Sequence, residues 1–188
     1  MEQKLKQALS QRQKVVNRDA SLKPSAVLVP LFVKDGEYHL AFTRRTHRVR
    51  VHKGEISFPG GAREKGDKTL LDTALRECSE EIGLAADDVE ILGELDDCPT
   101  IHSDYIISPF VGYVPQKYPF KLDQWEVAEL ITLPVSTLMD NDVASAEPVT
   151  IQGRTVNTYA YRFGSDLIWG ASARILHQFL EVWTGLKP

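Results

Sequence analysis

The sequence predicts one α/β domain spanning residues 1–188, in which a mixed sheet is covered by helices. Its 188 residues suit a single domain with a substantial core. Short apolar stretches bounded by turn residues alternate with segments of helical periodicity, which is typical of a mixed architecture. No repeat, low-complexity tract or linker divides the chain, so we expect no second domain.

The composition excludes several classes of function. The formal net charge is −4, so no basic field argues for nucleic acid as a partner. The chain has no apolar run long enough to cross a membrane, and its charged first residues have no signal-peptide core. Cys78 and Cys98 match neither a disulfide framework nor a metal motif, which predicts two buried thiols in a reducing cytoplasm.

The first elements are a helix and a strand. Residues 2–17 predict an amphipathic helix with one apolar side, formed by Leu5, Leu9 and Val16. The apolar stretch 25–33 predicts a strand, and Pro30 within it indicates an edge strand or a bulge, because proline cannot donate to a sheet ladder.

Asp35-Gly36 predicts a hairpin turn into the next strand. The final segment, residues 166–183, predicts a helix with one apolar stripe, formed by Ile168, Ile175, Phe179 and Trp183. The elements expected between them are strands at 38–45, 89–95 and 105–114, a strand and short helix within 128–140, and a hairpin around Gly153-Arg154.

The stretch from Thr69 to Ile82 predicts the central helix of the chain. Thr69 and Asp72 have the spacing of a capping box, and Gly83 is a favourable helix end. At about 100° per residue, one face of this helix is apolar and carries Leu71, Leu75, Cys78 and Ile82.

A second face of the same helix gathers three glutamates, Glu77, Glu80 and Glu81. Like charges at this spacing repel by a few tenths of a kcal/mol per pair, and Arg76 offsets part of that repulsion. An acidic face of this kind is either a solvated surface or a site for a hard cation such as Mg²⁺ or Mn²⁺, which prefers oxygen ligands.

A glycine-rich turn precedes the acidic helix and favours the site over the solvated surface. Phe58-Pro59 is followed by Gly60-Gly61, and paired glycines let the backbone approach a metal or a phosphate closely. Pro-Gly-Gly alone is only a turn, whereas its combination with the downstream pattern Arg-Glu-x-x-Glu-Glu-x-Gly is far more specific.

This combination resembles the signature of the Nudix hydrolase family, G-x5-E-x7-R-E-U-x-E-E-x-G-U, where U is a bulky aliphatic residue. Gly61 matches the first glycine, and the stretch from Arg76 to Leu84 matches the end. The chain departs from the pattern in three ways. Asp67 stands in place of the first glutamate, eight residues rather than seven precede Arg76, and Cys78 is not aliphatic.

We call this signature, from Gly61 to Leu84, the box, and its helix the box helix. The residues before the box resemble the coenzyme A pyrophosphatase branch of that family. Its upstream pattern is L-L-T-x-R-[ST]-x3-R-x3-G-x3-F-P-G-G. The chain matches it with Thr43, Arg45, Thr46, Arg50, Gly54 and Phe58 to Gly61. The resemblance implies a Nudix-type α/β/α sandwich and metal-dependent hydrolysis of coenzyme A to 4′-phosphopantetheine and adenosine 3′,5′-bisphosphate.

The resemblance also implies roles for the box residues. It implies Glu77 and Glu81 as the first choices for metal ligands, Glu80 as the next, and the Gly60 carbonyl as an additional ligand. The implied cofactor is Mg²⁺ or Mn²⁺. Arg76 is expected to orient a carboxylate through a charge-assisted pair.

The general base stays open between Glu80 on the helix and a later loop, which offers Glu126 and Glu129. The basic run at residues 44–53 is either a solvated loop, a nucleic-acid patch or a phosphate-binding segment. The resemblance favours phosphate binding by Arg45, Arg50 and Lys53.

The sequence leaves three functions open. The first is a coenzyme A diphosphatase. The second is a Nudix hydrolase of another nucleoside diphosphate derivative or of a nucleoside triphosphate. The third is a nucleotide sensor without hydrolysis, which the complete glutamate set argues against. The expected partner is a small molecule, and the sequence leaves open whether the protein is a monomer or a homodimer.

Overall fold

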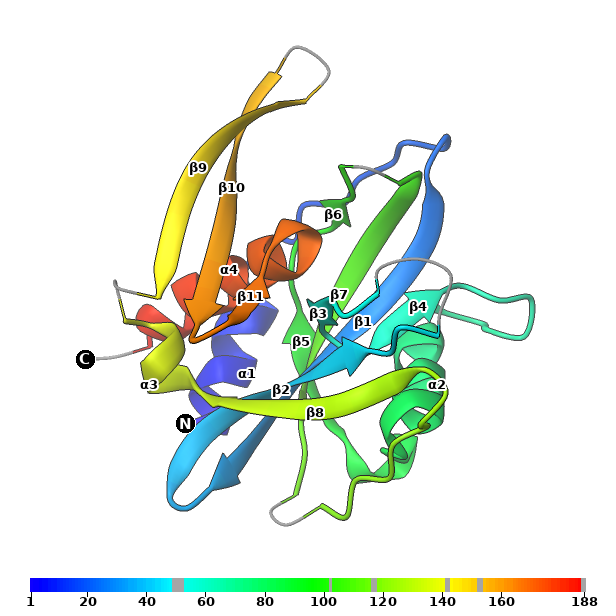
Figure 1. The fold of residues 1–188 in the computed structure, drawn as a ribbon, viewed down its shortest axis with the longest axis vertical. Helices are drawn as coiled ribbons and strands as arrows, with labels where there is room; N and C mark the ends of the chain where they lie inside the picture. The colour runs from blue at the N-terminus through cyan, green and yellow to red at the C-terminus, as the bar shows by residue number, and fades with distance from the viewer. Residues whose placement is uncertain (49–52, 102, 116–117, 141–142, 152–153, 187–188) are drawn as a thin grey trace.

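The structure is a computed structural model that describes residues 1–48, 53–101, 103–115, 118–140, 143–151 and 154–186 (Figure 1). Its helices are α1 (Glu2–Gln11), α2 (Leu70–Ile82), the 3-10 helix η1 (Ala86–Asp88), α3 (Val135–Leu138) and α4 (Gly170–Thr184). Its strands are β1 (Lys23–Lys34), β2 (Glu37–Arg45), β3 (Ile56–Ser57), β4 (Gly60–Ala62), β5 (Glu90–Glu94), β6 (Cys98–Pro99), β7 (Tyr105–Tyr113), β8 (Val127–Pro134), β9 (Ala144–Ile151), β10 (Arg154–Phe163) and β11 (Asp166–Ile168).

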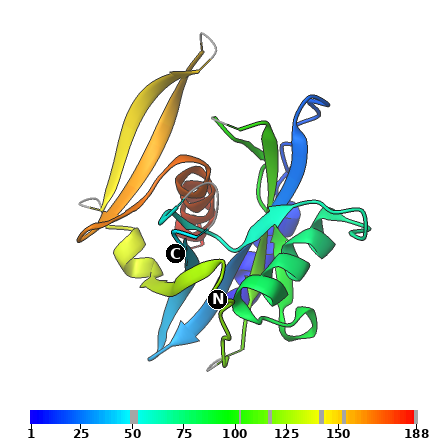
Figure 2. The same ribbon diagram turned by 45° about the vertical axis from the view of Figure 1, so that its right-hand side comes forward.

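The main sheet is mixed, as the sequence predicts. Its strands follow the order β3-β2-β1-β7-β5, while β4 pairs with β1, β6 with β7 and β8 with β2. The long β1–β7 pair is parallel and the other pairs are antiparallel. A smaller sheet of β11, β10 and β9 carries a long hairpin that extends away from the main sheet (Figures 1 and 2).

Helices cover both faces of the main sheet, which gives the α/β sandwich. Alternate residues of β1 point to opposite faces, so Ala26 and Leu28 join one buried cluster and Val29 and Leu31 the other. The first cluster contains Ala74, Cys78 and Ile82 of α2. The second contains Leu5 and Leu9 of α1 together with Ile175, Phe179 and Trp183 of α4.

Several local predictions are confirmed. Asp35 and Gly36 both have positive φ and connect β1 to β2, as a primed hairpin turn requires. Strands β9 and β10 pair as the predicted hairpin, although residues 152–153 lie outside the described residues. Both cysteines are free and buried.

Among the described residues, no helix has the length and apolarity needed to cross a membrane.

The N-terminal helix is shorter than the predicted 2–17. It ends at Gln11, and Arg12 has an extended backbone. Val15 then donates its N–H to Asp96 and accepts a hydrogen bond from the N–H of Asp97. These long-range bonds hold the segment against the connection between β5 and β6, and Val16 is 55% exposed. Tertiary contacts therefore override the helical pattern beyond Gln11.

The prediction that Pro30 marks an edge or bulged strand is wrong, because β1 is the central strand of the sheet. On one side, β1 pairs continuously with β7, and Pro30 lies opposite Gly112. On the other side, the pairing with β4 ends at Val27 and the pairing with β2 begins at Leu31. Pro30 lies in this gap between two partners, where a missing N–H leaves no ladder bond unmade.

The last helix begins later than the predicted residue 166. Asp166 to Ile168 form β11, in which Ile168 pairs with Tyr161 of β10, and α4 starts at Gly170. Ile168 is buried as expected, but on a strand. Its apolar spacing fits both a helix and a strand end, and the neighbouring β10 decides between them.

Candidate active site

Helix α2 begins and ends where its capping residues require. Thr69 accepts a hydrogen bond from the N–H of Asp72, and the Asp72 carboxylate accepts one from the N–H of Thr69. Gly83 ends the helix in the left-handed conformation. The helix packs its apolar side on β1 and turns its acidic residues toward β4 and the end of β2.

The paired glycines of β4 let this strand lie very close to β1 on one side, through Gly60, and to α2 on the other, through Gly61. A Cβ atom on Gly60 would lie 2.3 Å from the carbonyl oxygen of Ala26. A Cβ atom on Gly61 would lie 2.4 Å from Oε1 of Glu77. Both distances are far below normal contact, so any larger residue would displace either β1 or the Glu77 carboxylate.

Glu81 is buried beneath this strand, with 4% of its side chain exposed. The Arg45 guanidinium lies 3.4 Å from its Oε1, and the Gly60 N–H lies 3.4 Å from its Oε2. Burial raises the pKa of Glu81 to about 8, and Arg45 only partly opposes that effect. The sequence predicts Glu81 as a site residue, but its burial comes from the close approach of β4.

Glu77 and Glu80 share Arg76. Arg76 Nη1 lies 3.0 Å from Glu77 and 2.9 Å from Glu80, which confirms that this arginine pairs with box carboxylates. Desolvation raises the pKa of Glu77, and the Arg76 charge opposes the increase. Glu80 is 60% exposed, so its charge is largely screened by water.

Asp67 is a residue whose importance the sequence did not reveal, because it entered only as a departure from the family pattern. Its buried carboxylate accepts hydrogen bonds from Arg76 Nε at 3.0 Å and Nη2 at 3.1 Å. The N–H of Glu64 and the hydroxyl of Thr73 donate to it as well. The hydrogen bonds from Arg76 hold the pKa of Asp67 well below its usual range. Asp67 therefore fixes Arg76, which in turn contacts Glu77 and Glu80.

The loop that carries Glu126 is attached to the C-terminal end of α2. The N–H of Lys121 donates to the carbonyl of Ile82, and the N–H of Asp123 donates to that of Glu81. This docking brings Glu126 to 3.9 Å from Arg45, and the Glu126 charge contributes to the raised pKa values of Glu77 and Glu81. Helix carbonyls without intrahelical partners thus position the loop.

Glu129 does not join this group. It pairs with Arg44 at 3.0 Å, and Arg44 also binds Asp166 of β11 at 2.8 Å. Strand β8 places Glu129 opposite Arg44, whereas Arg45 faces Val127 across an irregularity in the ladder. The prediction that Glu129 lies on a loop is wrong, because it is part of β8. Of the two later candidates for a general base, the structure brings only Glu126 close to the box glutamates.

Of the three predicted phosphate-binding residues, the structure places only Arg45 beside the box glutamates. Arg45 lies in the site, and within the described part of the chain its Nε has no hydrogen-bond partner although it is buried. Lys53 is exposed in a turn. Arg50 lies outside the described residues.

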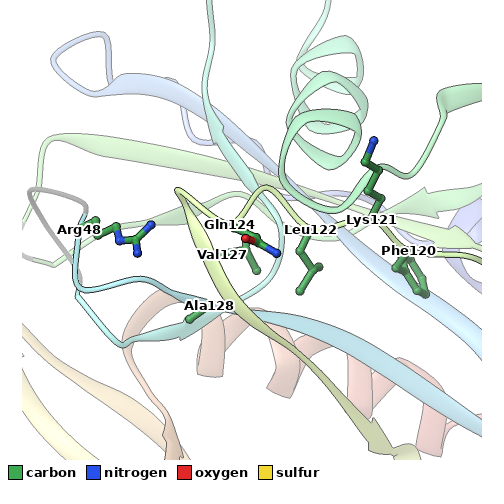
Figure 3. Close-up of a pocket in the computed structure, with 7 residues that line it drawn as sticks. All are labelled: Arg48, Phe120, Lys121, Leu122, Gln124, Val127 and Ala128. Carbon is green, nitrogen blue, oxygen red and sulfur yellow. The ribbon is translucent and has the colours of Figure 1, made fainter.

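A pocket of about 710 Å³ adjoins the loop that carries Glu126 and was not predicted from the sequence. Figure 3 shows Arg48 and Lys121 toward opposite ends of the pocket, with Gln124 and Val127 between them. The Arg48 guanidinium lies 5.8 Å from the centre of the Trp125 ring, and Trp125 is 62% exposed. A tryptophan in the otherwise polar stretch 123–126 was the available sequence signal.

The carboxylate oxygens of this site are the type of ligand that a hard divalent cation prefers. Glu81 and Glu77 offer buried and half-buried carboxylate oxygens, and the missing Cβ of Gly61 leaves the room that Glu77 occupies. Among the residues that the structure describes, no three acidic, histidine or cysteine side chains already converge on one point. Arg45 and Arg76 instead compensate these carboxylates, and a bound cation would take over part of that compensation.

Comparisons with known proteins agree with this geometry. The NUDIX domain family matches residues 22–152. An uncharacterized Nudix hydrolase NudL from Photorhabdus laumondii is 34% identical over 158 residues, which cover 84% of this chain and 83% of the relative. A Yersinia pestis protein of the same name is 32% identical, with coverages of 86% and 80%.

Among solved structures, the chain is similar in fold to a MutT/nudix family protein from Enterococcus faecalis. That likeness has a TM-score of 0.61 at 14% identity and covers 93% of this chain and 66% of the other. A C. elegans Ap4A hydrolase has a TM-score of 0.52 at 14% identity, with coverages of 63% and 84%. At such identities the likeness concerns the fold alone.

Proposed function

This chain belongs to the Nudix family of hydrolases, and from that premise we propose that it hydrolyses the diphosphate bond of coenzyme A or its derivatives. Nudix hydrolases are pyrophosphohydrolases of nucleoside diphosphate derivatives and generally use divalent ions such as Mg²⁺ or Mn²⁺. Hydrolysis of a diphosphate-containing substrate therefore follows from the family. Coenzyme A as that substrate is our proposal.

The observation that carries the proposal is the burial of Glu81 between Gly60 and Arg45, beside Glu77. Burying a carboxylate is costly unless it is paired, and here the pairing distances are long at 3.4 Å. A divalent cation held by Glu77 and Glu81, with Glu80 and the Gly60 carbonyl as further donors, would compensate this charge. When bound, the cation would screen the diphosphate and acidify the attacking water.

The residues of the chain supply the remaining functions. Arg45 offers its cationic fork to a phosphate oxygen next to Glu81, and its Nε has no hydrogen-bond partner among the residues that the structure describes. Water attacks one phosphorus of the diphosphate, the bridging P–O bond breaks, and the bridging oxygen leaves with the other phosphate. Each product keeps one of the two phosphates of the diphosphate, and the adenosine product also keeps its 3′-phosphate. The proton lost by the water passes to a carboxylate. Glu126 suits that role because it lies 3.9 Å from Arg45, which itself contacts Glu81, whereas Glu80 is held at 2.9 Å by Arg76.

Coenzyme A is supported by the upstream pattern from Thr43 to Gly61, which resembles the coenzyme A pyrophosphatase branch. Strand β2 brings the pattern's first arginine, Arg45, to the box helix. Arg45 and the glycines that end the pattern therefore lie beside the acidic residues, which supports a role of this segment in substrate selection.

A substrate panel tests the proposal. Coenzyme A, acyl coenzyme A, ADP-ribose, NADH and nucleoside triphosphates are incubated with the protein and Mg²⁺ or Mn²⁺, and the products are identified by mass spectrometry. We expect 4′-phosphopantetheine and adenosine 3′,5′-bisphosphate from coenzyme A. A preference of about tenfold, roughly 1.4 kcal/mol, for an unrelated nucleotide would overturn the coenzyme A assignment. Nucleotide binding without turnover of any substrate would indicate a sensor.

A further inference from the structure

We propose that Trp125 and Arg48, with the adjoining pocket, form the subsite that holds the base of the substrate nucleotide. The proposal rests on the proposed function for the position of the phosphates. The observation that motivates it is a large aromatic side chain that the fold leaves 62% exposed next to the candidate active site. Isolated exposed apolar residues are common, so the surroundings of Trp125 decide whether its exposure has a use.

Trp125 is held by its backbone rather than by core packing. Its carbonyl accepts a hydrogen bond from the Thr46 hydroxyl at 2.6 Å, and its N–H donates to the Asp123 carboxylate at 2.9 Å. The N–H of Asp123 is in turn bound to the carbonyl of Glu81. The backbone at Trp125 is therefore tied to the box helix and to the segment after β2, and the indole remains available for contact.

Arg48 and Trp125 together offer the chemistry that a nucleobase requires. The Arg48 guanidinium lies 5.8 Å from the centre of the indole ring, a cation–π distance. Aromatic rings and guanidinium planes are the surfaces on which unpaired bases stack. Gln124, which lines the pocket with Arg48, adds an amide that both donates and accepts hydrogen bonds (Figure 3).

The location fits a base whose phosphates lie at the glutamates. Trp125 directly precedes Glu126, which lies 3.9 Å from Arg45, and Arg45 contacts Glu81. The pocket wall beyond Gln124 is partly apolar, with Leu122, Val127 and Ala128. A flexible pantetheine arm has no flat face that would use the indole, whereas a purine has one. The observations therefore favour the adenosine half of the substrate at this end of the site.

The test compares two ligands that differ only in the base, AMP and ribose 5-phosphate. Their dissociation constants are measured by calorimetry for the wild type, Trp125→Ala and Trp125→Phe. Loss of one base-stacking contact costs about 1–3 kcal/mol, so Trp125→Ala should weaken AMP binding about 5- to 150-fold. Trp125→Phe should retain most of the affinity. Ribose 5-phosphate should bind all three proteins equally.

Two controls make the result decisive. Trp183→Phe, a change within the core on α4, should leave the AMP affinity unchanged, and thermal melts should show that Trp125→Ala keeps the fold because the ring is exposed. Equal losses for AMP and ribose 5-phosphate, or no loss for either, would overturn the inference. That outcome would refute the base subsite but not coenzyme A hydrolysis. Conversely, if Trp125→Ala weakens AMP binding but the wild type does not cleave coenzyme A, only the proposed substrate is refuted.

Discussion

Replacing Asp67 with asparagine should destabilise the protein and disturb the site through Arg76. The Asp67 carboxylate receives two hydrogen bonds from Arg76, one from the N–H of Glu64 and one from the hydroxyl of Thr73. Asparagine keeps the shape but loses the charge and one acceptor oxygen. The two bonds from Arg76 are charge-assisted, and such bonds contribute about 1.5–3 kcal/mol each when buried.

The loss in the free energy of unfolding should be smaller than the sum of both bonds. Arg76 keeps Glu77 and Glu80 as partners, and its side chain is 22% exposed. We therefore expect a loss of about 2–4 kcal/mol in the free energy of unfolding at neutral pH. Each kcal/mol corresponds to about 2–4 °C in Tm for a chain of this size. Urea unfolding and thermal melts measure both quantities.

The pH dependence of this effect has a definite sign. The folded pKa of Asp67 is depressed below its unfolded value, because Arg76 and the other donors stabilise the carboxylate. Its contribution is therefore fully present above the unfolded pKa of about 3.9 and is lost as the pH falls toward the folded value. The difference between the wild type and Asp67→Asn should therefore stay nearly constant from pH 6 to about pH 5 and shrink as the pH falls below about 4.

The matched control is Asp87→Asn, an exposed aspartate in η1, which should change stability by less than about 0.5 kcal/mol. An Asp67→Asn protein as stable as that control, or with the same deficit at about pH 2 as at pH 6, would refute this role of Asp67. Asp67→Glu provides a second comparison, because it keeps the charge and matches the family pattern. It should fall between asparagine and the wild type.

Three further outcomes are expected at the site. Removal of divalent ions by a chelator should abolish diphosphate hydrolysis, and Mg²⁺ or Mn²⁺ should restore it; activity that survives exhaustive chelation would contradict the carboxylate site. Glu81→Gln should lower kcat by about 100-fold or more, equivalent to about 3 kcal/mol, while the melting curve stays normal. A kcat near that of the wild type at limiting metal would show that Glu81 is not a metal ligand. Arg45→Ala should lower kcat/KM about 10- to 150-fold, from about 1.5–3 kcal/mol, to the same extent for coenzyme A and 3′-dephospho-coenzyme A, because Arg45 lies at Glu81 and hence at the diphosphate. A loss confined to coenzyme A would instead assign Arg45 to the 3′-phosphate.

Local sequence determined the elements whose hydrogen bonds close within a few residues. Thr69, Asp72 and Gly83 specify both ends of α2, and Asp35-Gly36 specifies the β1–β2 turn. The box residues also lie on one helix, so their relative spacing is fixed by helical geometry alone. For this reason the acidic face and the pairing of Arg76 with its neighbours were predictable.

Only the tertiary structure decided which of those glutamates is buried and what faces it. Glu81 is buried and Glu80 exposed because β4 packs against one side of α2, where the missing Cβ of Gly61 allows the strand to approach closely. Likewise, Pro30 sits in a central strand because two partners leave a gap there. Trp125 meets Arg48 because a loop binds the end carbonyls of α2. Contacts between residues distant in sequence depend on the packing of whole elements, and no local pattern encodes that packing.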